Sequence, residues 1–317
     1  MISGCAGVAL SSIDGGDAET LLRNAEHALS QARAGSARVR FYSRATSALA
    51  VRRLDLESKL RRALERGELA LHYQPKLSLA TGAIVGFEGL VRWYDAELGW
   101  VTPTEFISVA EETGSIVPLG DWVLREACRQ HVAWRERGLG SVPIAVNLSA
   151  RQFLRGEVAR RVQTILGETG AEPSAIGLEI TESVLFEDAD HALRELHALR
   201  ALGVELALDD FGTGFSSLAY LRKLPVSAVK IDRTFLEEIG EREDAAALTA
   251  SIVSLAKALW LRVIAEGVER EPQRALLQMW GCDEAQGFLF HPAVPALEAE
   301  RLWHQKGAPK ATEPSAG

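Results

Sequence analysis

The feature that most constrains the fold is a regular alternation of strand and helix patterns between residues 101 and 290. Short apolar runs such as VPIAVNL, IGLEIT and VELALDD alternate with longer segments whose apolar residues recur at helical spacing. Parallel strands need crossover helices of this kind, because the chain must return to the same end of the sheet before the next strand. The pattern therefore predicts the α/β class, most simply a (β/α)8 TIM-like barrel.

The remainder of the chain divides by composition. Residues 1–45 predict a short strand, a loop and a helix, which is too little chain for a full core. Residues 46–66 predict a linker helix, in which leucines recur among alternating charges. Residues 67–306 hold the predicted barrel. Residues 307–317, rich in Ala, Pro and Gly, predict a disordered tail.

The segment TPTEFISVAEETG carries the signals of one complete helix. Thr102 is the expected N-cap, and the proline that follows it suits the first helical position. Glu105 would close a capping box with Thr102, and Gly114 would end the helix. We therefore expect both the start and the end of this helix to be set locally.

Charge and cysteine content exclude several functions. A net charge of −8 argues against binding to polymeric nucleic acid. Cys5, Cys128 and Cys282 are odd in number and lack metal-ligand spacing, so we expect reduced thiols and a cytoplasmic location, although an upstream part of a longer protein could carry sensor or membrane segments. The longest apolar stretch carries charged residues and is not expected to span a membrane.

Polar residues stand at the carboxyl ends of the predicted strands. In a (β/α)8 barrel these ends meet on one face, where the active sites of such barrels lie. One buried carboxylate is most often part of a structural ion pair, but its repetition around the barrel favours a shared site. The residues concerned are Glu88, Asn147, Glu179, Asp209, Asp210, Lys230, Asp232, Glu266 and Gln286.

This set of side chains favours hard-metal chemistry. Carboxylate and amide oxygens suit Mg²⁺ or Mn²⁺, whereas zinc prefers His and Cys, which are absent from these strand ends. Lys230 would be charged and could position a water or a phosphate oxygen. An aldolase is the alternative, because a lysine at a strand end can form a Schiff base. The surrounding carboxylates oppose the deprotonation that an aldolase requires.

Several long motifs resemble those of the EAL-domain phosphodiesterases, which open cyclic di-GMP. They cover about residues 54–300 and include YQPKLSLATGAIVGFEGLVRW, PTEFISVAEETG, NLSARQF, LEITES, LALDDFGTGFSSLAYLRKLPVSAVKIDRTF, VIAEGVE and DEAQGFLF. The resemblance implies a barrel with one antiparallel strand. It also implies hydrolysis of cyclic di-GMP to linear pGpG by water activated at two metal ions, within a homodimer.

The resemblance also assigns the metal ligands and catalytic residues. Two Mg²⁺ or Mn²⁺ ions are implied, with Asp209 bridging them, while Ca²⁺ is expected to bind and inhibit. The implied metal ligands are Glu88, Asn147, Glu179, Asp209, Asp210 and Glu266. Lys230 is implied to position the attacking water, and the implied catalytic set is Lys230, Glu266, Glu88 and Asp210.

Further residues take supporting roles by the same resemblance. The implied substrate contacts are Gln74, Leu90, Arg92, Asp232 and Gln286. The residues implied to support the metal site and the loop after it are Glu182, Glu269, Phe211, Gly212 and Gly214.

The first 45 residues resemble the C-terminal end of a GGDEF, or diguanylate cyclase, domain. Their DGGD tetrapeptide is interpreted as a turn, because the cyclase signature would lie upstream of the first residue. We therefore expect no synthesis of cyclic di-GMP by this chain, which is interpreted as part of a longer GGDEF–EAL protein.

One position departs from the usual family motif. Gly89 stands where the family usually has alanine. Because strand side chains alternate, Glu88, Leu90 and Arg92 are predicted to face the barrel mouth, whereas Gly89 faces the helices. We predict that this glycine is tolerated and that the chain is an active phosphodiesterase. A catalytically silent cyclic di-GMP receptor or regulatory module, and a scaffold that does not use the nucleotide, are the alternatives.

Overall fold

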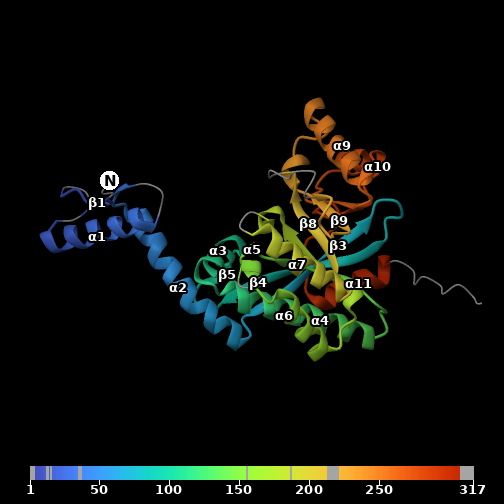
Figure 1. Cartoon of the computed structure of the whole chain (residues 1–317), viewed down its shortest axis with the longest axis horizontal. Helices are drawn as coiled ribbons and strands as arrows, with labels where there is room; N and C mark the ends of the chain where they lie inside the picture. Colours follow the sequence, from blue (N-terminus) through green and yellow to red (C-terminus); the bar gives the residue numbers. More distant parts are fainter. Residues whose placement is uncertain are drawn as a thin grey trace, which may run out of the picture. The chain divides into compact units, whose positions relative to one another are not determined.

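The computed structural model describes residues 4–11, 14, 16–34, 38–154, 156–185, 188–212 and 221–307 (Figure 1). The chain forms two compact units, Met1–Arg62 and Ala63–Gly317. No helix in the described residues is long and apolar enough to cross a membrane. The tail predicted at 307–317 lies, except for Gly307, outside the described residues.

The first unit is a small α/β structure. Its strands β1 (Ala6–Val8) and β2 (Val39–Phe41) pair in parallel, and helix α1 (Ala18–Ala34) connects them. Helix α2 (Arg44–Arg66) follows, and it corresponds to the predicted linker helix.

The second unit is a closed mixed barrel of eight strands. Strand β3 pairs antiparallel with β4 and β11, while the other neighbouring barrel strands pair in parallel. The prediction of a TIM-like barrel with one antiparallel strand is confirmed. A short strand, β5 (Gly99–Val101), adds antiparallel to β4. The barrel strands are β3 (Leu69–Ser78), β4 (Ile84–Asp95), β6 (Ile144–Leu148), β7 (Ile176–Thr181), β8 (Glu205–Phe211), β9 (Ala228–Ile231), β10 (Arg262–Ala265) and β11 (Glu284–Ala285).

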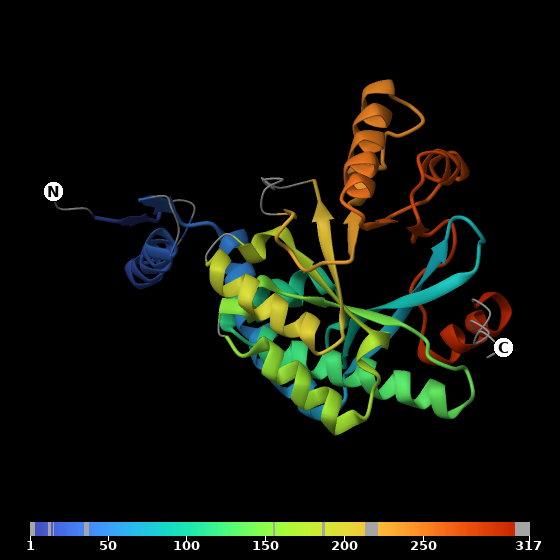
Figure 2. The same cartoon turned by 45° about the vertical axis from the view of Figure 1, so that its right-hand side comes forward.

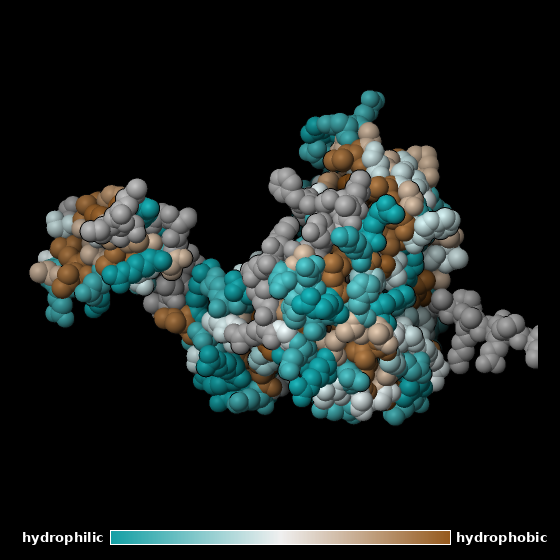
Figure 3. All heavy atoms as spheres, viewed as in Figure 1, coloured by the Kyte–Doolittle hydropathy of each residue, from teal (hydrophilic) through white to brown (hydrophobic). Residues whose placement is uncertain are grey.

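Helices surround these strands (Figure 2). The α-helices are α3 (Pro103–Thr113), α4 (Ile116–Glu136), α5 (Ala150–Leu154), α6 (Val158–Thr169), α7 (Ala189–Ala201), α9 (Glu243–Ala258), α10 (Glu271–Met279) and α11 (Ala296–Lys306). Short 3-10 helices are η1 (Pro173–Ala175), η2 (Glu182–Leu185) and η3 (Arg233–Phe235). Hydrophilic residues cover much of the barrel surface in the view of Figure 3.

Helix α3 starts after Thr102 and stops at Gly114, as its sequence predicts, but the predicted capping box does not form. Thr102 makes no side-chain cap hydrogen bond. The physical reason is that its backbone carbonyl already accepts the N–H of Glu105, at 3.0 Å, so this donor is not available to the threonine hydroxyl. Gly114 takes a left-handed conformation with φ 78°, which glycine adopts without steric cost.

Aromatic packing fixes which way the side chains of β4 point. Phe87 is fully buried and its ring lies 5.5 Å from Trp134 of α4 and 6.1 Å from Trp303 of α11. Trp93 on the same face packs edge-on against Phe106 of α3. Because successive side chains alternate, residues with even numbers between them, including Glu88, face the barrel interior.

Candidate active site

A buried lysine stands among four carboxylates at the carboxyl ends of the strands. Lys230 of β9 is 1 % exposed. Its Nζ lies 2.5 Å from Oε2 of Glu179, on β7, and 2.5 Å from Oε1 of Glu266, which follows β10. It also lies 3.3 Å from Oδ1 of Asp209 and 3.6 Å from Oε2 of Glu88. Five residues that are far apart in the sequence therefore share one cluster.

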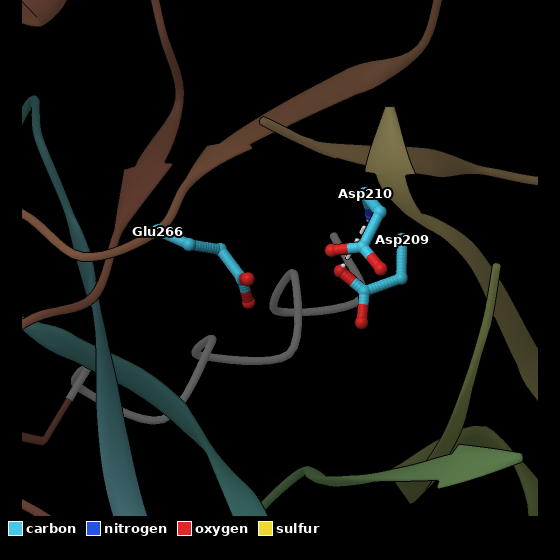
Figure 4. Close-up of side chains that lie close together, drawn as sticks. All are labelled: Asp209, Asp210 and Glu266. Carbon is cyan, nitrogen blue, oxygen red and sulfur yellow. Dashed lines mark hydrogen bonds between the residues drawn. The ribbon is translucent and has the colours of Figure 1, made fainter. Parts of the chain in front are cut away.

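A bulge in β8 brings two consecutive aspartates to this cluster. The register between β8 and β9 shifts between Leu208 and Phe211, and Asp210 has a left-handed backbone with φ 53°. A regular strand would send Asp209 and Asp210 to opposite faces, and the bulge removes that constraint. Ligand oxygens of Asp209, Asp210 and Glu266 lie within 4.8 Å of one another, and Figure 4 shows these carboxylates directed into a common space.

Amide side chains position the carboxylate of Glu88. Nδ2 of Asn147 donates to its Oε1 at 2.6 Å, and Nε2 of Gln286 donates to its Oε2 at 2.5 Å. Gln286 also donates to Glu266 at 2.9 Å. The buried Oε1 of Gln286 and Oε2 of Glu182 have no hydrogen-bond partner among the described residues. A buried oxygen without a hydrogen-bond donor is energetically costly, and a bound cation would interact with its lone pairs and remove that cost.

The cluster holds more negative charge than Lys230 can neutralise. Burial, reinforced by the charge of Glu88, raises the pKa of Glu179 to about 7, although Lys230 opposes the rise. Burial likewise raises the pKa of Glu266 well above its usual value. Burial and the neighbouring Asp209 raise the pKa of Asp210. Additional positive charge at this site would therefore be favourable.

Lys230 is held in its charged form. Burial acts to lower the pKa of Lys230, but the carboxylates of Glu179 and Glu266 outweigh it and raise that pKa well above its usual value. A Schiff-base lysine must lose its proton, so this environment disfavours the aldolase alternative. Burial acts to raise the pKa of Glu88, yet Lys230 and the bond from Gln286 lower it overall.

Of the residues predicted to support the loop after β8, some contact the start of that loop and others do not. Oε1 of Glu182 accepts the backbone N–H of Gly212 at 3.1 Å, and Phe211 is buried beside it. Gly212 has φ 97°, and a side chain there would meet the ring of Phe235 at 3.0 Å. Glu269 is exposed after β10. Gly214 lies outside the described residues, as does most of the helix pattern that follows it.

A cavity of about 560 Å³ opens beside the carboxylates. Leu90 and Arg92, two of the predicted substrate contacts, line it together with metal-ligand candidates Asn147, Glu179, Asp209 and Asp210. Arg92 also donates to the carbonyl of Val91 at 3.0 Å, and the other predicted contacts have protein partners as well. Gln74 donates to the carbonyl of His291 at 3.2 Å, and Asp232 accepts the N–H of Thr234 at 3.0 Å. Gln286 bonds Glu88 and Glu266, as described above.

Sequence reasoning missed polar residues that do not end a parallel strand. Lys76 of the antiparallel strand β3 lies 3.5 Å from Glu179, with only 12 % of its side chain exposed. The signal was available, because Gln74 and Lys76 are two residues apart and share a face. Glu111 of α3 also lines the cavity, where its Oε1 accepts the hydroxyl of Ser149 at 2.6 Å.

Comparison with known proteins decides the family. The profile of the EAL domain matches residues 57–293, which is most of the chain. The chain belongs to the EAL domain family. Relatives include the bifunctional diguanylate cyclase/cyclic di-GMP phosphodiesterase MucR of Pseudomonas aeruginosa, 44 % identical over 93 % of this chain and 43 % of its own length. The cyclic di-GMP phosphodiesterase PdeR of Escherichia coli is 40 % identical over 95 % of this chain and 45 % of its own length. This EAL chain thus spans less than half the length of these relatives.

Solved structures resemble the EAL barrel closely. The PaMucR phosphodiesterase in complex with c-di-GMP has a TM-score of 0.74 and 46 % identity, covering 77 % of this chain and 99 % of that one. The EAL domain of Mycobacterium smegmatis DcpA has a TM-score of 0.64 and 35 % identity, with the same coverage of both chains. These comparisons confirm the family and the fold that the sequence motifs predict.

Proposed function

We propose that this EAL domain hydrolyses cyclic di-GMP to the linear dinucleotide pGpG. The observation that carries the proposal is the buried cluster of carboxylates around Lys230, which opens directly into a cavity of nucleotide size. The similarity to a solved c-di-GMP complex and to named cyclic di-GMP phosphodiesterases supports the same substrate.

The donor set fits divalent cations. Asp209, Asp210 and Glu266 form one group of oxygens at mutual distances of 4.8 Å or less, and Glu88, Asn147 and Glu179 provide further oxygens around Lys230. We propose that they hold two Mg²⁺ or Mn²⁺ ions, with Asp209 contributing to both. Such ions, when bound, offset the carboxylate charge and lower the pKa of coordinated water. Ca²⁺ tolerates looser geometry and is expected to bind while supporting little turnover.

The residues of the chain divide the remaining tasks. The charged Lys230 can donate hydrogen bonds to an attacking water and to the carboxylates that hold it. Asn147 and Gln286 fix the orientation of Glu88, so that its oxygens do not need to reorganise during the reaction. Arg92 lines the cavity and can bind a phosphate of the substrate. In-line attack by water needs no covalent intermediate on the protein.

The decisive experiment is incubation with cyclic di-GMP and Mg²⁺ or Mn²⁺, followed by chromatography for pGpG. We expect product, its loss in excess EDTA, and its return when either ion is added back. Full turnover in EDTA would contradict metal-dependent hydrolysis. Calorimetric binding of cyclic di-GMP in Ca²⁺ without any product in Mg²⁺ or Mn²⁺ would indicate the silent receptor. If cyclic di-GMP does not bind at all, the remaining interpretation is a scaffold that does not use the nucleotide.

Further proposals concern the context of the domain. We propose that residues 1–45 are the C-terminal fragment of a GGDEF-like domain, joined by the linker helix to a catalytic barrel at 67–306. Free Cys5, Cys128 and Cys282 support a cytoplasmic location. A homodimer through the surface around α9 is also proposed, where Leu248 is 53 % exposed. Light scattering at micromolar concentration tests the dimer, and a fully active monomer would show that it is not needed.

A further inference from the structure

Strand β4 continues past the rim of the barrel. Its pairing with β6 ends at Gly89, opposite Val146. Beyond that point the described partners of β4 are β3 and β5, with Trp93 opposite Val101 and Tyr94 opposite Trp100. A three-stranded extension therefore rises from the barrel on the side where the carboxylates lie, because β4 runs in the same direction as the strands that carry them.

Aromatic side chains occupy the inner face of this extension. Leu90, Arg92 and Tyr94 follow Glu88 at intervals of two residues and share its face. His72 stands opposite Leu90, and Trp100 opposite Tyr94. The Trp100 ring lies 5.4 Å from Tyr94 and 6.3 Å from His72, both edge-to-face. We call His72, Tyr94 and Trp100 the aromatic platform.

The platform is open to solvent, whereas the other face of the same strands is closed. Trp100 is 64 % exposed and Tyr94 53 %, although both are large apolar rings. On the opposite face, Trp93 is fully buried against Phe106. The outer aromatics of the extension are therefore used in packing, whereas the inner rings contact one another edge to face and remain largely exposed. Rings held in this way can stack a planar ligand with little loss of conformational freedom.

The position of the platform relates it to the cavity. Arg92 lines the cavity and precedes Tyr94 by two residues, a distance of about 7 Å along a strand. Glu88 lies about 13 Å before Arg92 on the same face. A dinucleotide with one phosphodiester at the carboxylates and its other phosphate near Arg92 would therefore bring a nucleobase to the rings.

We infer that the aromatic platform stacks one guanine base of the cyclic dinucleotide and so forms a base subsite beyond the metal centre. This inference rests on the proposed function. Stacking of a base on an aromatic side chain contributes about 5- to 150-fold in affinity and depends on the ring face rather than on hydrogen bonds. The subsite therefore acts on binding of the substrate and not on the attack at phosphorus.

The test compares three variants in the complete chain. Trp100→Ala should raise KM for cyclic di-GMP by about tenfold and leave kcat within about twofold. Trp100→Phe keeps a stacking ring and should restore KM to within about threefold of the unmodified protein. Leu297→Ala is the control, since Leu297 of α11 is a large apolar residue that is 65 % exposed, away from the proposed dimer surface, and lines no described part of the cavity.

The outcomes separate this inference from the proposed function. An unchanged KM in Trp100→Ala, with normal hydrolysis, would overturn the base subsite and leave the phosphodiesterase intact. An equal rise of KM in Leu297→Ala would also overturn it. If the unmodified protein neither binds nor hydrolyses cyclic di-GMP, the proposed function itself fails. An unchanged urea midpoint in Trp100→Ala would show that its rise in KM is not caused by a loss of folding. If Trp100→Ala does not fold, Trp100→Phe is compared with Trp100→Leu instead. A higher KM in Trp100→Leu, which lacks a ring, supports the base subsite, and equal KM values overturn it.

Discussion

Raising the pH should destabilise the metal-free protein through Glu179. In the folded chain, burial and the charge of Glu88 raise the pKa of Glu179 from 4.5 to about 7. An unfolded glutamate loses its proton near the lower value. Between these two values the folded state binds more protons than the unfolded state, so the free energy of unfolding falls as pH rises. Above about pH 7 both states are ionised and the contribution of Glu179 is constant.

The size of this effect follows from the interval between the two pKa values. The slope approaches about 1.4 kcal/mol per pH unit only midway between the two pKa values, so the fully buried Glu179 accounts for a loss of about 2 kcal/mol between pH 5 and 7.5. The raised pKa values of Glu266 and Asp210 act in the same direction. Glu88 does not contribute in this range, because its pKa is lowered and its stabilisation is lost only below its usual pKa.

Urea unfolding in excess EDTA measures the effect, with tryptophan fluorescence as the signal. Glu179→Gln is the matched control, because it keeps an oxygen that can accept from Lys230 and removes the titration. His72, whose pKa is lowered by burial and by Arg92, contributes the opposite sign equally in both proteins. We expect the unmodified protein to lose about 2 kcal/mol more than the variant between pH 5 and 7.5. Saturating Mg²⁺ should reduce this difference, since a bound cation favours ionised Glu179. Equal pH dependence of the two proteins in EDTA would refute the reasoning.

Three other predictions concern catalysis and packing. Lys230→Ala should lower kcat at least about a hundredfold while cyclic di-GMP still binds in Ca²⁺ by calorimetry; unchanged turnover would remove Lys230 from the mechanism. Glu88→Gln should lower hydrolysis by about a hundredfold, because a charged ligand is lost from a preorganised site, and near-normal rates in a product assay would contradict this. Gly89→Ala should leave hydrolysis within a few-fold and raise the free energy of unfolding by up to about 1 kcal/mol, because alanine restricts the unfolded chain more than glycine does. The new methyl group would lie 3.3 Å from Cγ1 of the buried Val146, which must shift by a few tenths of an ångström. A gain of activity from an inert protein in Gly89→Ala would instead show that the glycine silences the natural chain.

Much of the barrel was predictable because its signals are local. Apolar runs of strand length, helical spacing between them and the glycines that end helices are each contained within a few residues. The polar residues at strand ends were predictable for a related reason. In a barrel the carboxyl ends of the parallel strands all lie on one face. Glu88, Glu179 and Glu266 could therefore be assigned to one site from their positions along the strands, without knowledge of the distances between them.

The failures of sequence reasoning have two separate physical causes. Thr102 and Glu105 have the spacing of a capping box, yet the backbone carbonyl of Thr102 takes the donor that its hydroxyl would need. Lys76 was missed because the rule of strand ends applies to parallel strands, while β3 runs the opposite way and still brings Lys76 within 3.5 Å of Glu179.

The sequence by itself determined the barrel, the family and the chemical character of the site, since these depend on residue type and order. Only the tertiary structure determined which charged side chains lie close together and therefore which of them are protonated. Alternation along β8 would separate Asp209 from Asp210, and the bulge opposite Lys230 brings both to one side. The position of Lys230 among Glu179, Glu266 and their neighbours sets the protonation of each group. Electrostatic energy depends on distance and burial, and these exist only once β7, β8, β9 and β10 lie side by side.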